Sequence, residues 1–154
     1  MSALLRLCTV ALIAFTAACG PQTFVEIDTA SEGSFTVADP APTVRPYLDG
    51  AIVVLSEEQG EQLALVTIEL PEINTLQEGE AVDIEDAGIA MVASRGDLEV
   101  IEREDGTRVI NSQDARRFSA TSGTFTLDQR APLAGSFVVE LEDGGLLSGT
   151  FVTR

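Results

Sequence analysis

The chain has 154 residues, a formal net charge of −16 at pH 7, two Cys and no His. Its nine basic residues are all Arg, so it lacks the His or Lys base of most nucleophilic enzymes and the Lys of phosphate-binding loops. We therefore expect a protein that is not an enzyme, holds no cofactor or metal such as zinc, and does not bind nucleic acid, whose phosphates are recognised through Lys and Arg.

The first residues have the three parts of a secretory signal peptide. Arg6 is followed by an apolar run at 7–15 and then by small residues up to Cys19. The apolar run is too short to span a bilayer as a helix, which needs about 20 residues. We assign residues 1–18 to a signal peptide and expect the rest of the chain to be exported.

The end of this leader, Thr16-Ala17-Ala18-Cys19, resembles the lipobox of bacterial lipoprotein precursors, with Thr16 where that pattern usually has Leu. The resemblance implies cleavage before Cys19, a lipid on its sulfur and anchoring in a membrane, since two or more acyl chains hold a protein stably. No Asp follows Cys19, which in this family points to the outer membrane of the cell envelope. We expect a lipidated tether at 19–23. The alternative is an ordinary signal peptide cut near Ala18, which leaves a free cysteine.

The exported part opens with two strand-like runs, at 24–27 and 34–38. The stretch "DPAPTVRP" at 39–46 is too rich in proline for a helix or a central strand, so we expect an extended connection. We group these residues as an N-terminal segment at 24–46, before an all-β globular domain at 47–154. The sequence leaves open whether the two runs join the main sheet or belong to the tether.

From residue 47 onward, apolar runs recur every 8 to 14 residues with turn residues between them, and none keeps helical spacing over three turns. We expect strands at 51–56, 62–70, 82–86 and 88–94, with links at 57–61, 71–81 and 112–118. The loop Glu104-Asp105-Gly106 predicts a hairpin that sets Glu102 opposite Arg108 and Val100 opposite Ile110. This is the pattern of an antiparallel β-sandwich or a small β-barrel.

The triplet Gly-[Ser/Thr]-Phe occurs four times, at 33–35, 123–125, 135–137 and 149–151. We interpret the last three copies as a three-stranded meander over about 122–153. In each copy the ring faces the core, the hydroxyl faces solvent, and the glycine leaves space for a ring. The last third of the chain resembles many small bacterial lipoproteins in this pattern.

The meander also predicts a register. A loop at 129–133 pairs Phe125 with Phe137, and a loop at 143–145 pairs Phe137 with Phe151, so that three rings form a row on one face. The alternative is an open aromatic row that stacks on sugars or lipids. Such rows usually contain Trp and Tyr, whereas this chain has no Trp and one Tyr.

Two further patterns carry possible chemistry. The stretch "FVEIDTAS" at 24–31 resembles the active-site segment of aspartic proteases, with Asp28 in the position of the catalytic carboxylate and Ala30 where that family has Gly. The resemblance implies a hydrolase in which two chains each supply one Asp. Acidic residues also cluster at three places: Glu80, Asp83, Glu85 and Asp86; Asp97, Glu99, Glu102, Glu104 and Asp105; Glu140, Glu142 and Asp143.

Carboxylates that converge from loops are the ligands that calcium prefers, but none of these clusters has EF-hand spacing. Alternating acids on a strand are typical of a solvent-facing side. Calcium binding is therefore left open by the sequence.

Taken together, these patterns predict a lipoprotein anchored in the envelope membrane through Cys19. Its body is expected to be a non-catalytic binding or structural module, and the sequence does not identify a protein or small-molecule partner. A competing hypothesis is a small β-barrel that carries an apolar molecule. Such a barrel would have a cavity of roughly several hundred Å³ behind the phenylalanine row. The third is an aspartic-type hydrolase that acts through Asp28.

Overall fold

The computed structural model describes residues 22–154, which form ten β-strands and no helix. The strands make one antiparallel sheet in the order β2-β1-β10-β9-β8-β7-β5-β4-β3, and β6 pairs with β8. This confirms the predicted all-β, antiparallel class. The sheet is not closed into a barrel, since β2 and β3 stand at its two ends, so the fold is consistent with the sandwich alternative.

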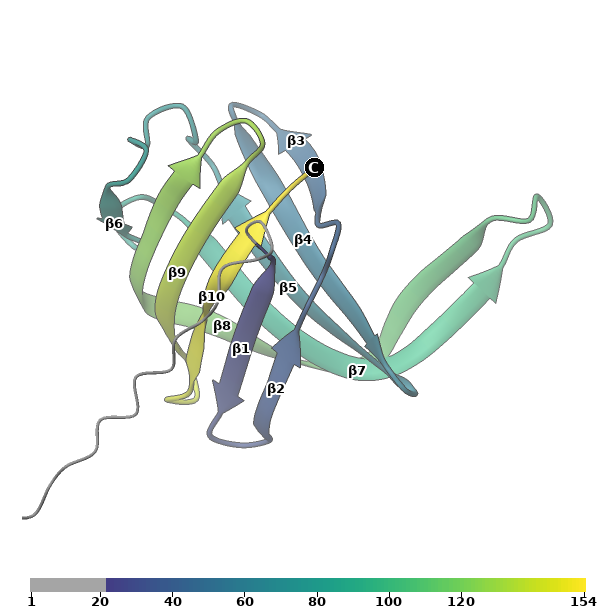
Figure 1. Ribbon diagram of the computed structural model, residues 1–154. Helices are drawn as coiled ribbons and strands as arrows, with labels where there is room; N and C mark the ends of the chain where they lie inside the picture. The colour runs from purple at the N-terminus through teal and green to yellow at the C-terminus, as the bar shows by residue number, and fades with distance from the viewer. Residues whose placement is uncertain (1–21) are drawn as a thin grey trace, which may run out of the picture.

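The strands of the described residues are β1 (Phe24–Thr29), β2 (Gly33–Val37), β3 (Thr43–Tyr47), β4 (Gly50–Gln59), β5 (Gln62–Leu70), β6 (Ala81–Asp83), β7 (Ala90–Glu102), β8 (Arg108–Gln129), β9 (Ala134–Leu141) and β10 (Leu146–Val152). The first part of β8 pairs with β7 and its last part with β9. The sheet thus folds along the length of β8, and its two parts form two layers (Figure 1). We call β1, β2, β9, β10 and the end of β8 the terminal layer, and β3, β4, β5 and β7 the central layer.

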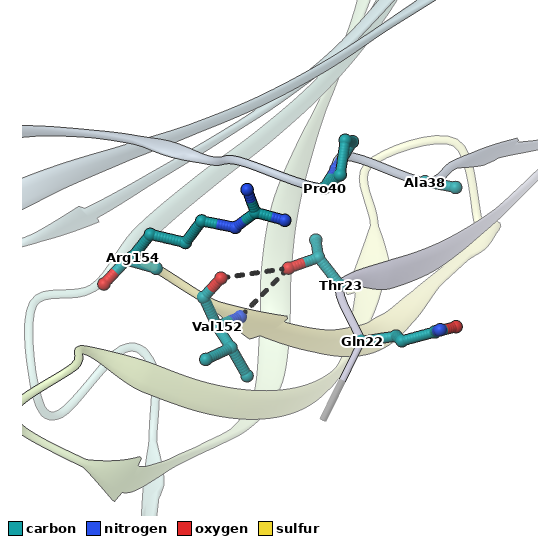
Figure 2. A pocket seen from close by; sticks show the side chains of 7 residues that line it. Gln22, Thr23, Ala38, Pro40, Val152 and Arg154 are labelled. Atoms are coloured by element: carbon teal, nitrogen blue, oxygen red, sulfur yellow. Dashed lines mark hydrogen bonds between the residues drawn. The ribbon is translucent and has the colours of Figure 1, made fainter. Parts of the chain in front are cut away.

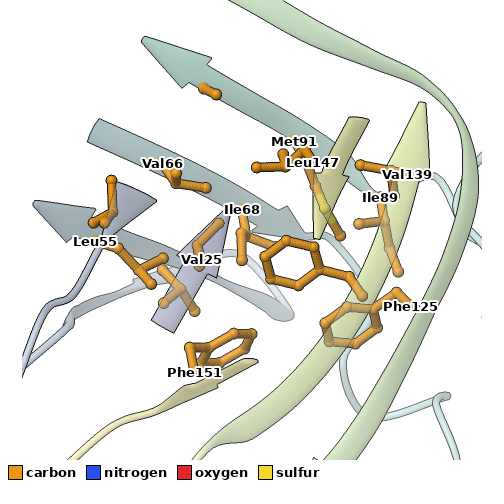
Figure 3. Packing of buried hydrophobic residues seen from close by; sticks show 14 of the residues in the cluster. Val25, Leu55, Val66, Ile68, Ile89, Met91, Phe125, Val139, Leu147 and Phe151 are labelled. Atoms are coloured by element: carbon orange, nitrogen blue, oxygen red, sulfur yellow. The ribbon is translucent and has the colours of Figure 1, made fainter. Parts of the chain in front are cut away.

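The hydrophobic core lies between these layers (Figure 3). Phe125 and Phe151 reach into it from the terminal layer, and Leu55, Ile68 and Met91 reach into it from the central layer, all of them essentially inaccessible to solvent. The side chains alternate between faces along each strand, as the period of two in β-structure requires. Each fully buried side chain of this size contributes about 1.5–3 kcal/mol.

The two N-terminal runs belong to the sheet, a point that the sequence left open. β1 pairs with β10, and β2 pairs with β1. Val25, Ile27 and Phe35 are buried in the common core. The proline-rich stretch is extended as expected, and part of it forms β3 at the end of the sheet, where Pro46 is tolerated because an edge strand needs fewer backbone donors.

Several predicted boundaries in the middle of the chain are wrong. The acidic turn is limited to Gly60 and Glu61, because Gly60 takes a φ of 66° and allows β4 to continue through Glu57. The strand expected at 82–86 ends at Asp83, whose carboxylate accepts a hydrogen bond from the backbone N–H of Glu85 at 2.9 Å and so starts a turn.

The link expected at 112–118 is also wrong, because these residues lie inside β8. The pairing of β7 with β8 shifts between Arg95 and Asp97, which is a β-bulge. Asp114 takes a positive φ of 48° on the opposite strand. The irregularity bends the two strands without ending them. Its sequence signal is the lone Gly96, where β8 passes so closely that an added Cβ would lie 2.6 Å from the carbonyl oxygen of Gln113.

The register of the meander is partly as predicted. Phe125 pairs with Phe137, which confirms the first hairpin. The second prediction is wrong by two residues, because Phe137 pairs with Gly149, and Phe151 pairs with Gly135. Since a shift of two keeps each side chain on its face, the predicted division into core and solvent sides still holds.

The cause of this shift is the turn between β9 and β10, which is built on Glu142, Asp143 and Gly144. The N–H of Leu141 donates to the carbonyl of Gly145, and the Asp143 carboxylate accepts the N–H of Gly145, both at 2.9 Å. Gly144 takes a φ of 81°, a conformation that favours glycine. The predicted loop, at 143–145, starts one residue later than the observed loop and therefore does not use Asp143 as its cap.

Candidate functional site

Past the body of the protein, β7 and β8 continue as a two-stranded ribbon that projects away from both layers (Figure 1). We call residues 98–112 the arm. Within it Val100 lies opposite Ile110 and Glu102 opposite Arg108, as predicted from the hairpin loop. The arm is therefore the best-predicted hairpin of the chain, but its projection from the body was not predicted.

A hollow of about 310 Å³ lies between the arm and the outer surface of the central layer. Its floor includes Val54 on β4 with Leu63 and Leu65 on β5, and Ile110 of the arm faces them. Arg45 and Glu58 add one charge of each sign to the lining. Thr43 and Ser56 complete the lining, so the site is a groove with four apolar and four polar residues.

The floor residues point outward because of the strand period. Val53 and Val66 are fully buried in the core, so their neighbours Val54 and Leu65 face the opposite side of the layer. Apolar residues on both faces explain why the sequence of these two strands is a nearly continuous hydrophobic run. Such runs are typical of strands that are covered on both sides, and on the outer side the nearby element is the arm.

The arm itself exposes apolar side chains on both of its faces. Val100 and Ile110 share one face, and Ile101 and Val109 share the other. The exposed fractions of Val100, Ile101 and Ile110 are 39%, 43% and 42%. Isolated two-stranded hairpins are only marginally stable in water, so an arm with this composition is better suited to a partner than to solvent.

The arm has more acids than arginines. Its acids are Glu99, Glu102, Glu104 and Asp105, against Arg103 and Arg108. The hydroxyl and the N–H of Thr107 hydrogen-bond to the carboxylate of Asp105 and lower its pKa, so the tip stays charged in mildly acidic solution. Between residues 22 and 154 the structure has one ion pair, Arg116 with Glu32 at 2.7 Å, and it lies outside the arm.

The predicted lipidation site, Cys19, lies outside the described residues. The described chain begins at Gln22, three residues later in the sequence, and Thr23 is held to the last strand, where its Oγ1 accepts the N–H of Val152 at 3.0 Å (Figure 2). The Thr150 hydroxyl donates to the carbonyl of Gln22 at 3.1 Å. A hollow of about 360 Å³ at this point is lined by residues from both ends of the described chain, including Arg154.

Asp28, the residue that the protease-like segment singled out, lies exposed on the outer face of β1. Its Oδ1 accepts a hydrogen bond from the Ser34 hydroxyl at 2.9 Å. Its neighbours across the strands are Leu146 and Ser34, so neither position supplies a second carboxylate. The geometry within one chain does not build the two-carboxylate arrangement of an aspartic protease.

The acidic clusters are used locally. In residues 22–154 no group of three or more Asp, Glu, His or Cys is placed to hold a metal ion. Partial burial of Asp143 favours a higher pKa, but hydrogen bonds from the N–H of Gly145 and from Ser31 outweigh it and lower the pKa below its usual value. Asp143 thus acts as a cap of its own turn and as a link to Ser31 of the β1–β2 turn.

A third hollow, of about 410 Å³, lies where β2 approaches the end of β4. The guanidinium carbon of Arg95 lies 5.6 Å from the centre of the Phe35 ring, a cation–π distance. The Gln59 side-chain amide donates to the carbonyl of Thr36 at 2.6 Å. These contacts join β2, at one end of the sheet, to β4 and β7 of the central layer, so we assign this hollow a structural role.

Comparison of the chain with protein-family models, with curated proteins and with solved structures found no match. In the part of the chain from residue 22 onward, no helix is long and apolar enough to cross a membrane. The groove beside the arm was not singled out by the sequence. Its only sequence signal is the adjacent apolar pairs Val100-Ile101 and Val109-Ile110, since a half-buried strand would alternate apolar and polar residues.

Proposed function

We propose that the protein is a bacterial envelope lipoprotein, anchored through Cys19 in the outer membrane, and that its body is a non-catalytic module that binds another protein through the arm. The observation that carries the binding role is the exposure of apolar side chains on both faces of the arm. Exposed apolar side chains that gather on one element, rather than being scattered singly, mark interaction sites in soluble domains. Ile110 and the groove floor supply the apolar centre, and the acids of the arm supply a charged margin.

The leader sequence supports the anchor. The described body starts at Gln22, three residues beyond Cys19, and an extended chain spans at most about 3.6 Å per residue. A tether of this length keeps the body within about 10 Å of the membrane surface. A module held so close to a membrane is suited to partners that are themselves in the envelope.

The competing role as a carrier of an apolar molecule finds less support. That role was expected to require a closed barrel with space behind the phenylalanine rings. A side-chain carbon added at Gly135 would lie 2.8 Å from Cζ of Phe125 and 3.0 Å from Cε1 of Phe151. At Gly135 the two rings therefore leave no room for an added carbon beside them, and the sheet is open.

Site-specific photo-crosslinking in intact cells tests the proposed function. A photoreactive amino acid is placed at Ile110 in the groove and, as the control, at Val138, which is 52% exposed on the terminal layer. We expect one defined protein adduct from position 110 and none from position 138. The proposal fails if position 110 gives no protein adduct, or if both positions give the same set of adducts.

A further inference from the structure

We infer that the partner segment is extended and basic, and that it adds to the free edge of β8 in the arm as a third strand. This inference rests on the proposed function, because it assumes that the arm is the binding surface. It goes further by naming the conformation, the charge and the docking edge of the partner. Strand addition of this kind gains affinity from backbone hydrogen bonds and specificity from alternate side chains.

The first step is the absence of a third strand along the arm. β5 pairs with β7 as far as Asp97, and β9 pairs with β8 from Ala120 onward. Between these points the strands of residues 22–154 give the arm no neighbour beyond its own two strands. Edges that are free over this length are templates for pairing with another chain.

The second step is the direction of the backbone groups. The N–H of Leu98 donates away from the arm, to the carbonyl of Glu61 at 2.8 Å, whereas the N–H of Arg103 donates across it, to the carbonyl of Thr107 at 2.9 Å. Backbone groups alternate in direction along an antiparallel strand. The backbone groups of every second residue from Leu98 therefore point away from the partner strand, and so do those of the residues paired with them. Arg108 and Ile110 belong to this set, so their N–H and C=O groups face the free edge of β8.

The third step is the position of this edge. β8 is the arm strand that lies nearer to β3 and β4 in Figure 1, and Ile110 contributes to the hollow beside them. A strand added to β8 would enter that hollow. Every second side chain of the added strand would then face Val54 and Leu65 on its floor, which is the arrangement that selects alternating apolar residues.

The fourth step is the charge of the partner. Acids outnumber arginines on the arm by four to two, and the whole chain has a net charge of −16. A second copy would place acid against acid, and like charges across a strand pair are destabilising. A basic segment is attracted by the same field, so the occupant is an Arg- or Lys-containing strand of a different protein.

The test uses the lipid-anchored protein, purified in detergent, and a short fluorescent peptide of alternating Arg and Val. A peptide of alternating Glu and Val serves as the charge control. We expect the basic peptide to bind and the acidic peptide not to bind. Hydrogen exchange should slow at the amides of Arg108 and Ile110 when the basic peptide is added, because these donors become bonded.

Two variants separate strand addition from simple attraction. Ile110→Pro removes an outward N–H without removing a bond to β7, and Ile110→Ala removes the same apolar side chain but keeps the N–H. We expect the proline variant to bind the basic peptide about tenfold more weakly than the alanine variant. The reason is that proline removes one backbone hydrogen bond to the peptide and distorts the next one. Arg108→Pro against Arg108→Ala repeats the comparison at a second outward position, in case proline at 110 unfolds the arm.

The inference is overturned if the proline and alanine variants bind equally at both positions, since the peptide then docks through side chains or charge alone. It is equally overturned if the acidic peptide binds as well as the basic one. If either outcome occurs, the crosslinking experiment can still give a protein adduct at position 110, so the proposed function can hold although the strand-addition inference fails. Failure of the proposed function is recognised separately, by the absence of that adduct.

Discussion

Gly135 occupies a point in the core where two aromatic rings leave no room for a side chain. It pairs with Phe151 on one side and lies across from Leu127 on the other. The rings of Phe125 and Phe151 are stacked, with centres 6.4 Å apart and planes at 21°. The glycine of this triplet therefore accommodates rings from the neighbouring strands, not the ring of its own triplet.

Replacing Gly135 with Ala should destabilise the protein by about 1–3 kcal/mol, because the added carbon forces the two rings to move in a packed core. Urea denaturation of the mature protein gives this free energy of unfolding. Ser136→Ala, on the solvent side of the same strand, is the matched control and should change it by less than about 0.5 kcal/mol. Equal effects of the two substitutions would show that the space beside the rings is not filled.

Asp143 should make stability depend on pH. Its pKa is lowered in the folded protein, so its contribution is present above the pKa of the unfolded chain and is lost as the pH falls through the folded value. Asp143→Asn should therefore be less stable than the native protein at pH 7, and the difference should shrink in acid. Urea midpoints measured at neutral and acidic pH test this, and a difference that stays constant with pH would contradict it.

At the scale of elements, the arm depends on two strands that the body does not support. The central strands β5 and β7 are paired on both sides within the body, whereas the arm has no third strand among residues 22–154. A ribbon with free edges opens more easily than a central strand. This is why the arm combines a well-determined hairpin register with the capacity to accept another strand.

Hydrogen exchange on the unliganded protein should reveal this difference in stability. We expect the amides of Ile101 and Val109, which bond across the arm, to exchange far faster than the amides of Val66 and Ile68 in β5. Both pairs are β-branched residues within strands, so they differ mainly in their surroundings. Equal protection would mean that the arm is already supported by the body and would weaken its assignment as a binding element.

The elements also show what a sequence of this kind determines. Strand positions and the faces of the meander were predictable, because alternation and turn residues act within a few positions of each other. The register of β9 with β10 was not, since it depends on the cap that Asp143 makes for Gly145. The continuity of β8 was missed because a bulge at Arg95 replaces the turn that residues 112–118 were expected to form.

The candidate site was less predictable than the fold. The hollow joins Leu65 of one strand to Ile110 of another, and their proximity follows from the bend of β7 and β8 and not from any local pattern. Apolar residues at Val100 and Ile101 were visible, but they fit a buried strand equally well. At Asp28, the residue of the third hypothesis, the chain itself places no second carboxylate across the strands, because the neighbours on β2 and β10 are uncharged.

At the scale of the whole molecule, we propose an acidic body with a packed core, held close to a membrane by a short tether, that presents an arm to a basic partner. The net charge of −16 supports this arrangement, since it keeps copies of the protein apart and steers basic segments toward it. In this proposal the lipobox-like sequence before Cys19 supplies the membrane anchor, and the arm supplies the surface for the partner. This account has no role for an interior ligand, and the rings beside Gly135 leave no room there for an added carbon.

The most direct test of this account is the intact mass of the native protein, purified from envelope membranes under gentle conditions. We predict a chain from Cys19 to Arg154 that carries diacylglycerol and a further acyl chain, with no small molecule released on denaturation. Cys19→Ala should yield no lipid-modified species. An unmodified chain that begins elsewhere would contradict the anchor, and a small apolar molecule lost on unfolding would contradict the packed core and restore the carrier hypothesis.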